Sequence, residues 1–170
     1  MSFRIRKAFL IPLGLLVIEI ITLLISCIMF DQPIGKAIIL GVIILPVIIL
    51  FIECVFRNTI IGDDHIWMRK LLRSKQMNYA EITAVETILV KKRAFITLCT
   101  PDEFLIFSNA YSNFPDMVRL LLDKVPAAVV TEETAAMAQN PPTKSTDILS
   151  CWMAVVLMGF ILYAQLKMFL

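Results

Sequence analysis

The sequence predicts a membrane α-helical protein with three transmembrane helices and a small α+β domain between the second and the third. Hydrophobic residues make up 59% of the 170 residues and charged residues only 18%, which is too apolar for a soluble chain of this size. The apolar residues are concentrated in residues 8–30, 37–56 and 148–166, each close to the ~20 residues that cross a bilayer. Residues 57–147 have the mixed composition of a water-soluble chain.

Residues 1–56 are expected to form a hairpin of two spans, 8–30 and 37–56. A basic start followed by an apolar run is also typical of a secretory signal, but this run exceeds a signal's ~7–15-residue apolar core and no A-x-A site follows it. The sequence LISC, which ends at Cys27, resembles a lipoprotein processing box. Glu19 lies within the stretch that such signals keep free of charge, so an uncleaved anchor is favoured over cleavage and lipidation.

Basic residues predict the orientation of the spans. They precede the first span (Arg4, Arg6, Lys7) and follow the second (Arg57, Arg69, Lys70, Arg73, Lys75), whereas the turn between these spans has one base and one acid. The positive-inside rule then places the N-terminus and residues 57–147 in the cytoplasm and the C-terminus outside. Trp152 and Tyr163 would lie at the inner and outer interfaces of the third span.

Alternating apolar and polar residues predict six short antiparallel strands after the second span, at 58–61, 65–72, 76–79, 82–90, 94–100 and 104–107. An amphipathic helix should follow, capped by Ser112 or Asn113, with Pro115 in its first turn. Its apolar face contains Met117, Val118, Leu121, Leu122 and Val125. The expected fold is a curved antiparallel sheet or partial barrel closed by this helix.

Residues 126–147 are expected to link this domain to the third span. A short helix over 131–139, with Thr131 as its cap, should end at the sequence NPPT, which begins at Asn140. The rest of the linker is expected to be a flexible or extended tether.

The order of strands and closing helix, the sequence YAEITAV that joins two strands at 79–85, and the pattern of 104–122 resemble the bacterial pleckstrin-homology-like domains attached to membrane spans. The resemblance covers about 57–125 and implies a binding or assembly module rather than an active site. Phosphoinositide-binding members of the wider superfamily carry basic residues around the first hairpin. Here that turn, Gly62 to Asp64, is acidic and would repel phosphates.

Seven basic residues are candidates for contact with anionic lipid headgroups, at ~1 kcal/mol each near the surface. Four lie around one predicted turn and three at a hairpin tip: Arg69, Lys70, Arg73, Lys75, Lys91, Lys92 and Arg93. The alternative is a solvated strand face that acts only as a topology signal. Nucleic-acid binding is not expected, because acidic residues are as numerous as basic ones in this domain.

Glu19 is the most informative single residue of the spans, because an ionisable group at mid-membrane usually faces protein or water. Thr22 and Ser26 follow at i+3 and i+7 on the same helix face. These three residues are predicted to form an intramembrane polar contact. The alternatives are structural packing within the helices, contact with another copy or a partner, and a proton or ion pathway.

The sequence contains no recognisable catalytic motif, and no cofactor or metal site is expected. Four cysteines and one histidine make neither a disulfide framework nor a zinc cluster. We therefore expect a non-enzymatic inner-membrane protein whose cytoplasmic domain binds an unknown protein or a copy of itself. The alternatives are an accessory subunit of a membrane transport or envelope-assembly complex with a contact at Glu19, and a membrane enzyme on an unrecognised scaffold.

Overall fold

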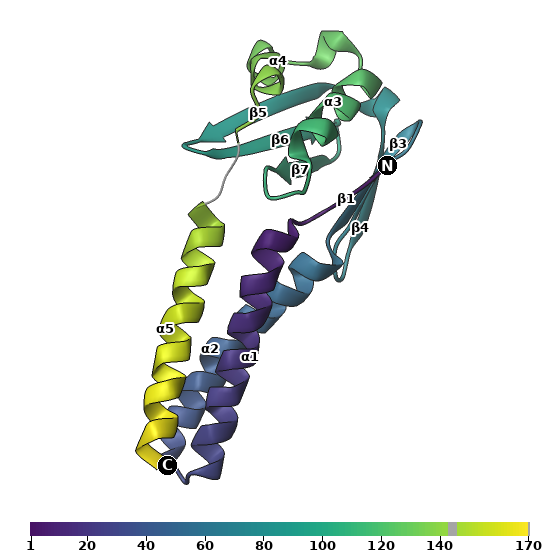
Figure 1. Ribbon diagram of the computed structural model, residues 1–170. Coiled ribbons are helices and arrows are strands. Elements are labelled where there is room, and N and C mark those ends of the chain that lie inside the picture. Colours follow the sequence, from purple (N-terminus) through teal and green to yellow (C-terminus); the bar gives the residue numbers. More distant parts are fainter. Residues whose placement is uncertain (143–145, 170) are drawn as a thin grey trace. The chain divides into compact units, whose positions relative to one another are not determined.

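The computed structural model describes residues 1–142 and 146–169, and the chain divides into two compact units (Figure 1). The helical unit consists of Lys7–Val55 and Ser145–Leu170, and the strand-rich unit consists of Met1–Arg6 and Phe56–Lys144. Each unit is therefore built from two separate stretches of the chain.

Three helices in the helical unit confirm the predicted spans. They are α1 (Lys7–Met29), α2 (Ile34–Phe56) and α5 (Thr146–Phe169), and each is long and apolar enough to cross a membrane. The fold is therefore that of a membrane α-helical protein with an α+β unit. Helix α1 packs along α5, its distant neighbour in sequence. Helix α2 is mostly exposed, and Phe51 approaches α1 where Gly14 leaves room for its ring.

The strand-rich unit contains two antiparallel sheets. The first has four strands, β1 (Ser2–Arg4), β2 (Asn58–Ile61), β3 (His65–Arg69) and β4 (Ser74–Asn78), in that spatial order. The second has three, β5 (Ala84–Val90), β6 (Arg93–Cys99) and β7 (Phe104–Ser108). A 3₁₀ turn, η1 (Tyr79–Glu81), joins the sheets. Within the described residues the strands form these two separate sheets and do not close into a barrel.

Strand β1 corrects the sequence analysis, which counted six strands and placed residues 1–6 with the membrane hairpin. In the structure these residues form a seventh strand at the edge of the first sheet, with Phe3 opposite Thr59. Phe3 and Ile5 are buried while Ser2 and Arg4 are exposed, a period of two over five residues. So short an alternation cannot be distinguished from the basic start of a membrane anchor, which is why the prediction missed it.

Backbone hydrogen bonds hold β1 on both sides. The Met1 ammonium donates to the carbonyl oxygen of Ile61 at 2.7 Å, and the Ile61 N–H donates to the carbonyl oxygen of Met1 at 2.8 Å. On the other side the Ser112 N–H donates to the carbonyl oxygen of Arg4 at 2.8 Å, and Ile5 forms a bridge with Tyr111. The segment before the first span is therefore an integral part of the strand-rich unit.

The core of the strand-rich unit is formed by the buried faces of both sheets and of α3 (Phe114–Lys124), where the predicted amphipathic helix is confirmed. Its predicted apolar residues Met117, Val118 and Leu121 are buried. Pro115 lies in its first turn, and Asn113 occupies the N-cap position with a positive φ of 52° and without a side-chain cap. The cap residue is thus placed correctly, although its amide makes no capping bond.

A buried polar cluster joins the first sheet to the segment before α3. The Tyr111 hydroxyl accepts hydrogen bonds from Arg57 Nε and Thr59 Oγ1, both at 3.0 Å. Nearby, the Asn109 side chain donates to the carbonyl oxygens of Lys92 and Pro142, both at 2.8 Å. These bonds satisfy polar groups that burial would otherwise leave unpaired.

The predicted linker docks on the second sheet over much of its length. A 3₁₀ turn, η2 (Ala127–Val129), is followed by α4 (Glu132–Gln139), and the Thr131 hydroxyl accepts the predicted cap bond from the Thr134 N–H. The N–H of Thr131 and both threonine hydroxyls also donate to the carbonyl oxygen of Val85 on β5. This stretch is therefore packed structure. Of the tether predicted to end at residue 147, residues 143–145 lie outside the described residues, and Thr146 and Asp147 already belong to α5.

Replacing Phe3 with alanine should destabilise the strand-rich unit by about 3 kcal/mol, the usual range for removing a buried ring. Hydrogen–deuterium exchange of the β2 amides in the full-length protein would measure the effect. Ser2→Ala, on the exposed face of the same strand, is the matched control and should change little. Unchanged protection of β2 in the Phe3 variant would show that β1 does not hold the sheet.

Candidate functional site: an apolar sheet face and an intramembrane polar contact

The second sheet has an apolar face on its outer side, which we call the outer sheet face: Ile88, Phe95, Phe104 and Ile106. The exposed fractions are 54% for Ile88, 60% for Phe104 and 41% for Ile106. Phe95 lies directly across from Ile88, and Thr97 across from Ile106, so the apolar residues are cross-strand or diagonal neighbours. These apolar residues therefore adjoin one another across β5, β6 and β7, and the same face also carries Ser108 and the exposed Glu86, which lies opposite Thr97.

The other face of this sheet is buried except at the hairpin end, where Leu89 is 55% exposed, so both faces are rich in apolar residues. Ile96, Leu98 and Phe107 lie on the buried face and are 0–1% exposed. A sheet that covers a core on one side normally carries polar residues on its solvent side. The continuously apolar runs FLIF at 104–107 and ILV at 88–90 indicate that both faces of these strands are apolar, but not that one face remains exposed.

A basic side chain borders this apolar surface. Lys75 Nζ lies 5.7 Å from the centre of the Phe104 ring and 3.1 Å from Glu103 Oε2. This interaction joins β4 of the first sheet to the start of β7 in the second. Lys75 was predicted to contact lipid headgroups, but in the structure its ammonium is engaged by Glu103 and Phe104.

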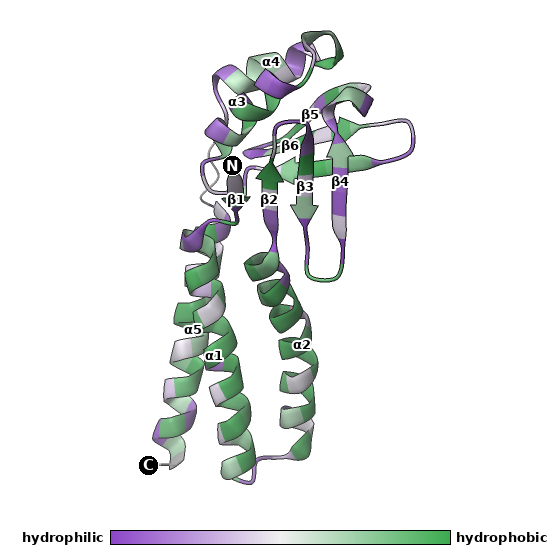
Figure 2. Ribbon diagram, turned by 90° about the vertical axis from the view of Figure 1, so that its right-hand side faces the viewer, coloured by the Kyte–Doolittle hydropathy of each residue, from purple (hydrophilic) through white to green (hydrophobic). Residues whose placement is uncertain are grey.

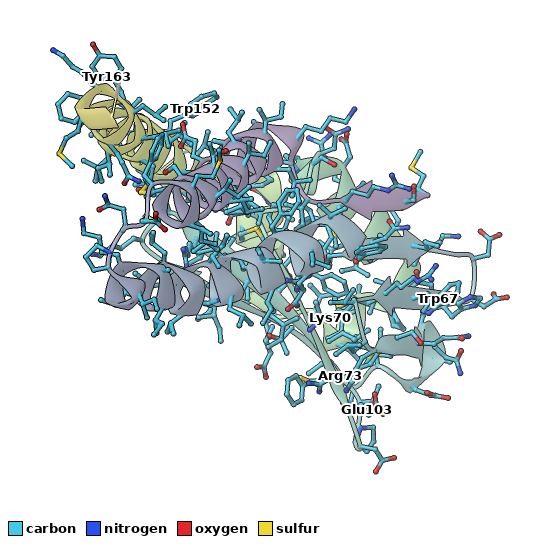
Figure 3. The ribbon with its side chains drawn as sticks, turned by 90° about the horizontal axis from the view of Figure 1, so that it is seen from below. Trp67, Lys70, Arg73, Glu103, Trp152 and Tyr163 are labelled. Atoms are coloured by element: carbon cyan, nitrogen blue, oxygen red, sulfur yellow. The ribbon has the colours of Figure 1, made fainter. Side chains whose placement is uncertain are left out.

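The other predicted headgroup residues fall into two places. Lys70 and Arg73 are in the β3–β4 turn, next to Arg69 at the end of β3 (Figure 3). Lys91, Lys92 and Arg93 form the β5–β6 hairpin tip, where Lys91 adopts a positive φ of 56° as tight two-residue hairpin turns require. Five of the seven side chains are exposed, and those of Lys70 and Lys75 are partly buried. The structure therefore divides the predicted basic set between two hairpin ends.

The acidic turn of the β2–β3 hairpin is tied to α3. Lys124 Nζ donates to Asp63 Oδ1 at 3.0 Å, and this hydrogen bond and the ammonium charge lower the pKa of Asp63. Tyr79 is buried beside this turn and its hydroxyl donates to the carbonyl oxygen of Gly62 at 3.4 Å. Burial, with the Asp63 charge as a smaller cause, raises the pKa of Tyr79 to about 12. The acidic turn is thus paired with Lys124 of α3 in the same unit.

In the helical unit, two of the three predicted intramembrane residues face α5. Glu19 Oε1 lies 3.2 Å from the point that a Cβ would occupy on Gly159, so the absence of a side chain there lets the carboxyl group approach. Glu19 Oε2 is buried and has no hydrogen-bond partner among the described residues. Thr22 is exposed, and its hydroxyl donates within α1 to the carbonyl oxygen of Ile18.

Ser26 forms the clearest polar contact between the helices. Gln165 Nε2 on α5 donates to Ser26 Oγ at 2.7 Å and lies 3.5 Å from Cys27 Sγ. The Ser26 hydroxyl in turn donates to the carbonyl oxygen of Leu23. The sequence analysis identified Ser26 but not its partner, because periodicity within one helix does not say which helix it meets.

Among the described residues no group of three or more histidine, cysteine or acidic side chains could hold a metal ion. No disulfide joins the cysteines within the described residues, and Cys27 and Cys151 are buried in the helical unit. The chemistry available at the surfaces above is therefore apolar contact, hydrogen bonding and charge pairing.

No protein-family model, curated protein or solved structure matches this chain.

The Ser26–Gln165 bond should couple α1 to α5 by about 1 kcal/mol, within the range measured for hydrogen bonds between membrane helices. A double-mutant cycle with Ser26→Ala and Gln165→Leu, read by unfolding of the protein in mixed micelles, would measure this coupling. Thr22→Ala is the control, since its hydroxyl bonds only within α1. Additive effects of the two substitutions would show that the bond contributes nothing.

Lys124→Met should raise the pKa of Asp63 toward its ordinary value, because it removes both the hydrogen bond and the positive charge. Carboxyl-carbon NMR titration of the full-length protein would follow it, with Lys124→Arg as the charge-preserving control. A folded-state pKa below the unfolded one stabilises the fold above the unfolded pKa, and this contribution is lost as the pH falls. An unchanged Asp63 titration in the methionine variant would contradict the assignment.

Proposed function

We propose that this chain is a non-enzymatic inner-membrane protein of a bacterium whose strand-rich unit, a pleckstrin-homology-like domain on the cytoplasmic side, binds a protein partner or a second copy of itself. The observation that carries this proposal is the outer sheet face. A contiguous apolar surface on a water-facing unit marks an interaction site, because exposing it to water has no folding benefit.

The order of elements supports the pleckstrin-homology-like assignment. Two antiparallel sheets are followed by an amphipathic helix that buries its apolar face in the core. This keeps the order of strands and closing helix on which the resemblance rests. The acidic β2–β3 turn and its bond from Lys124 favour protein binding over recognition of inositol phosphates.

The arrangement of Glu19 favours this function over an accessory subunit that contacts its partner through the bilayer. The buried oxygen Oε2 is covered by the chain's own helices, and Oε1 faces Gly159 of α5. A partner helix would need access to that carboxyl group. Packing of α1 against α5 is therefore the role that the geometry of Glu19 supports.

Ile106→Glu and Ile88→Glu should each abolish the association, because a carboxylate in an apolar interface is costly to bury. A photocrosslinking amino acid in place of Thr97, at the centre of the outer sheet face, would report it in native membranes. The mass of the adduct distinguishes a second copy from another protein.

Gln76→Glu is the matched control, since Gln76 is exposed on β4 of the other sheet. Glu19→Gln tests the alternative in the same membranes. Loss of adducts in the Glu19 variant but not in the Ile106 variant would replace this function with an intramembrane contact.

A further inference from the structure

The β3–β4 turn exposes two adjacent leucines. Leu72 is 89% exposed, and Leu71 is also exposed. The turn has a defined conformation, because the Lys70 N–H donates to the carbonyl oxygen of Arg73 at 2.8 Å. Packing within the strand-rich unit therefore does not account for the leucines, and a polar turn would serve the hairpin equally well.

The strand register shows which end of the sheet carries this turn. Arg4 pairs with Asn58, Asn58 with Arg69, and Arg69 with Ser74, so these residues form one row across all four strands. The turn begins directly beyond that row, at the end of the sheet where β2 starts (Figure 2).

Both chain connections to the membrane hairpin leave from the same row. Only Arg57 lies between Asn58 and the last residue of α2, and only two residues lie between Arg4 and the first residue of α1. At ~3.3 Å per residue, two residues separate the row from the end of α2 by roughly 7 Å. The four-residue turn projects a similar distance, about 5–7 Å, beyond the same row. The end of the sheet that carries the leucines is therefore the end joined to α1 and α2, by connections of only one or two residues.

Basic residues flank the leucines on both sides. Arg69 and Lys70 precede them and Arg73 follows, whereas the opposite end of the sheet carries Asp63 and Asp64. Leucine flanked by arginine and lysine is the composition of segments that lie in a membrane interface, with apolar side chains among the acyl chains and cations at the headgroups. One end of the first sheet is thus basic and apolar, and the opposite end is acidic.

We propose that Leu71 and Leu72 insert into the interfacial layer of the bilayer that holds the spans, with Arg69, Lys70 and Arg73 at the lipid headgroups. The ligand is the lipid surface itself rather than a soluble headgroup. This contact gives the first sheet a third attachment to the membrane besides its two chain connections. It is independent of the outer sheet face, which belongs to the other sheet.

Depth-dependent quenching tests the insertion. Leu72→Trp is placed in a full-length protein carrying Trp67→Phe and Trp152→Phe, and the protein is reconstituted in vesicles of phosphatidylglycerol and phosphatidylcholine with brominated acyl chains. Asp64→Trp, at the opposite end of the same sheet, is the matched control. We expect quenching at least about threefold stronger at position 72 than at position 64, because only an inserted side chain meets the bromine atoms.

Trypsin provides a second measurement on the natural turn. In the same vesicles, cleavage after Arg73 should be slower than cleavage after Lys92 of the exposed hairpin tip, and Leu71→Ser with Leu72→Ser should remove this protection. Equal quenching at positions 72 and 64, or equally fast cleavage of the natural and serine variants, would overturn the proposal. These vesicles contain only lipid and this protein. A result that overturns the proposal would therefore assign the leucines to a protein partner that the vesicles lack.

Discussion

The pairing of β1 with β2 is the constraint on which the rest of the structure depends. These strands lie on either side of a membrane hairpin of two 23-residue helices, yet they are hydrogen-bonded neighbours in one sheet. The hairpin is thus an insertion between two adjacent strands rather than an anchor placed before a domain. Both chain connections between the hairpin and the sheet leave from one row of the sheet, that of Arg4 and Asn58.

This constraint also distinguishes the first sheet, which is joined to the membrane hairpin, from the second sheet, which carries the outer sheet face. The end of the first sheet that carries Leu71 and Leu72 is also the end from which the chain enters α1 and α2, while the second sheet contributes the apolar outer face and makes no direct chain connection to α1 or α2. Lys75 links the two sheets through Glu103 and Phe104. A protein bound on the outer sheet face would therefore be coupled to the first sheet through the contacts of Lys75 with Glu103 and Phe104.

The sequence predicted the features that depend on long, regular patterns. The spans, the strand over 58–61, the buried face of α3 and the Thr131 cap follow from apolar runs, alternation and local capping chemistry. It could not predict features set by partners distant in sequence. In the sequence, Phe3 belongs to a short basic segment, and only its pairing with Thr59 of β2 identifies it as a strand residue. The partner of Ser26, Gln165, is likewise identified only by the packing of α5 against α1.

The outer sheet face was missed for a different reason. A continuous apolar run such as FLIF is also the pattern of a strand buried on both sides, so the sequence alone does not reveal that Phe104 and Ile106 remain exposed. The two cases are distinguished only by whether another element packs on the face, and in the structure Phe104 and Ile106 remain 60% and 41% exposed.

Membrane insertion also resolves the folding problem that this connectivity creates. Strands β1 and β2 are separated by more than fifty residues, and closing so long a loop in water costs roughly 3 kcal/mol of chain entropy. Two antiparallel spans, each about 34 Å long at 1.5 Å per residue, return the chain to the side from which it started. A hairpin of two helices of equal length therefore ends close to where it begins, which places Arg4 and Asn58 near one another. This closure by the helices accounts for the pairing of a strand of three residues with a partner so distant in the sequence.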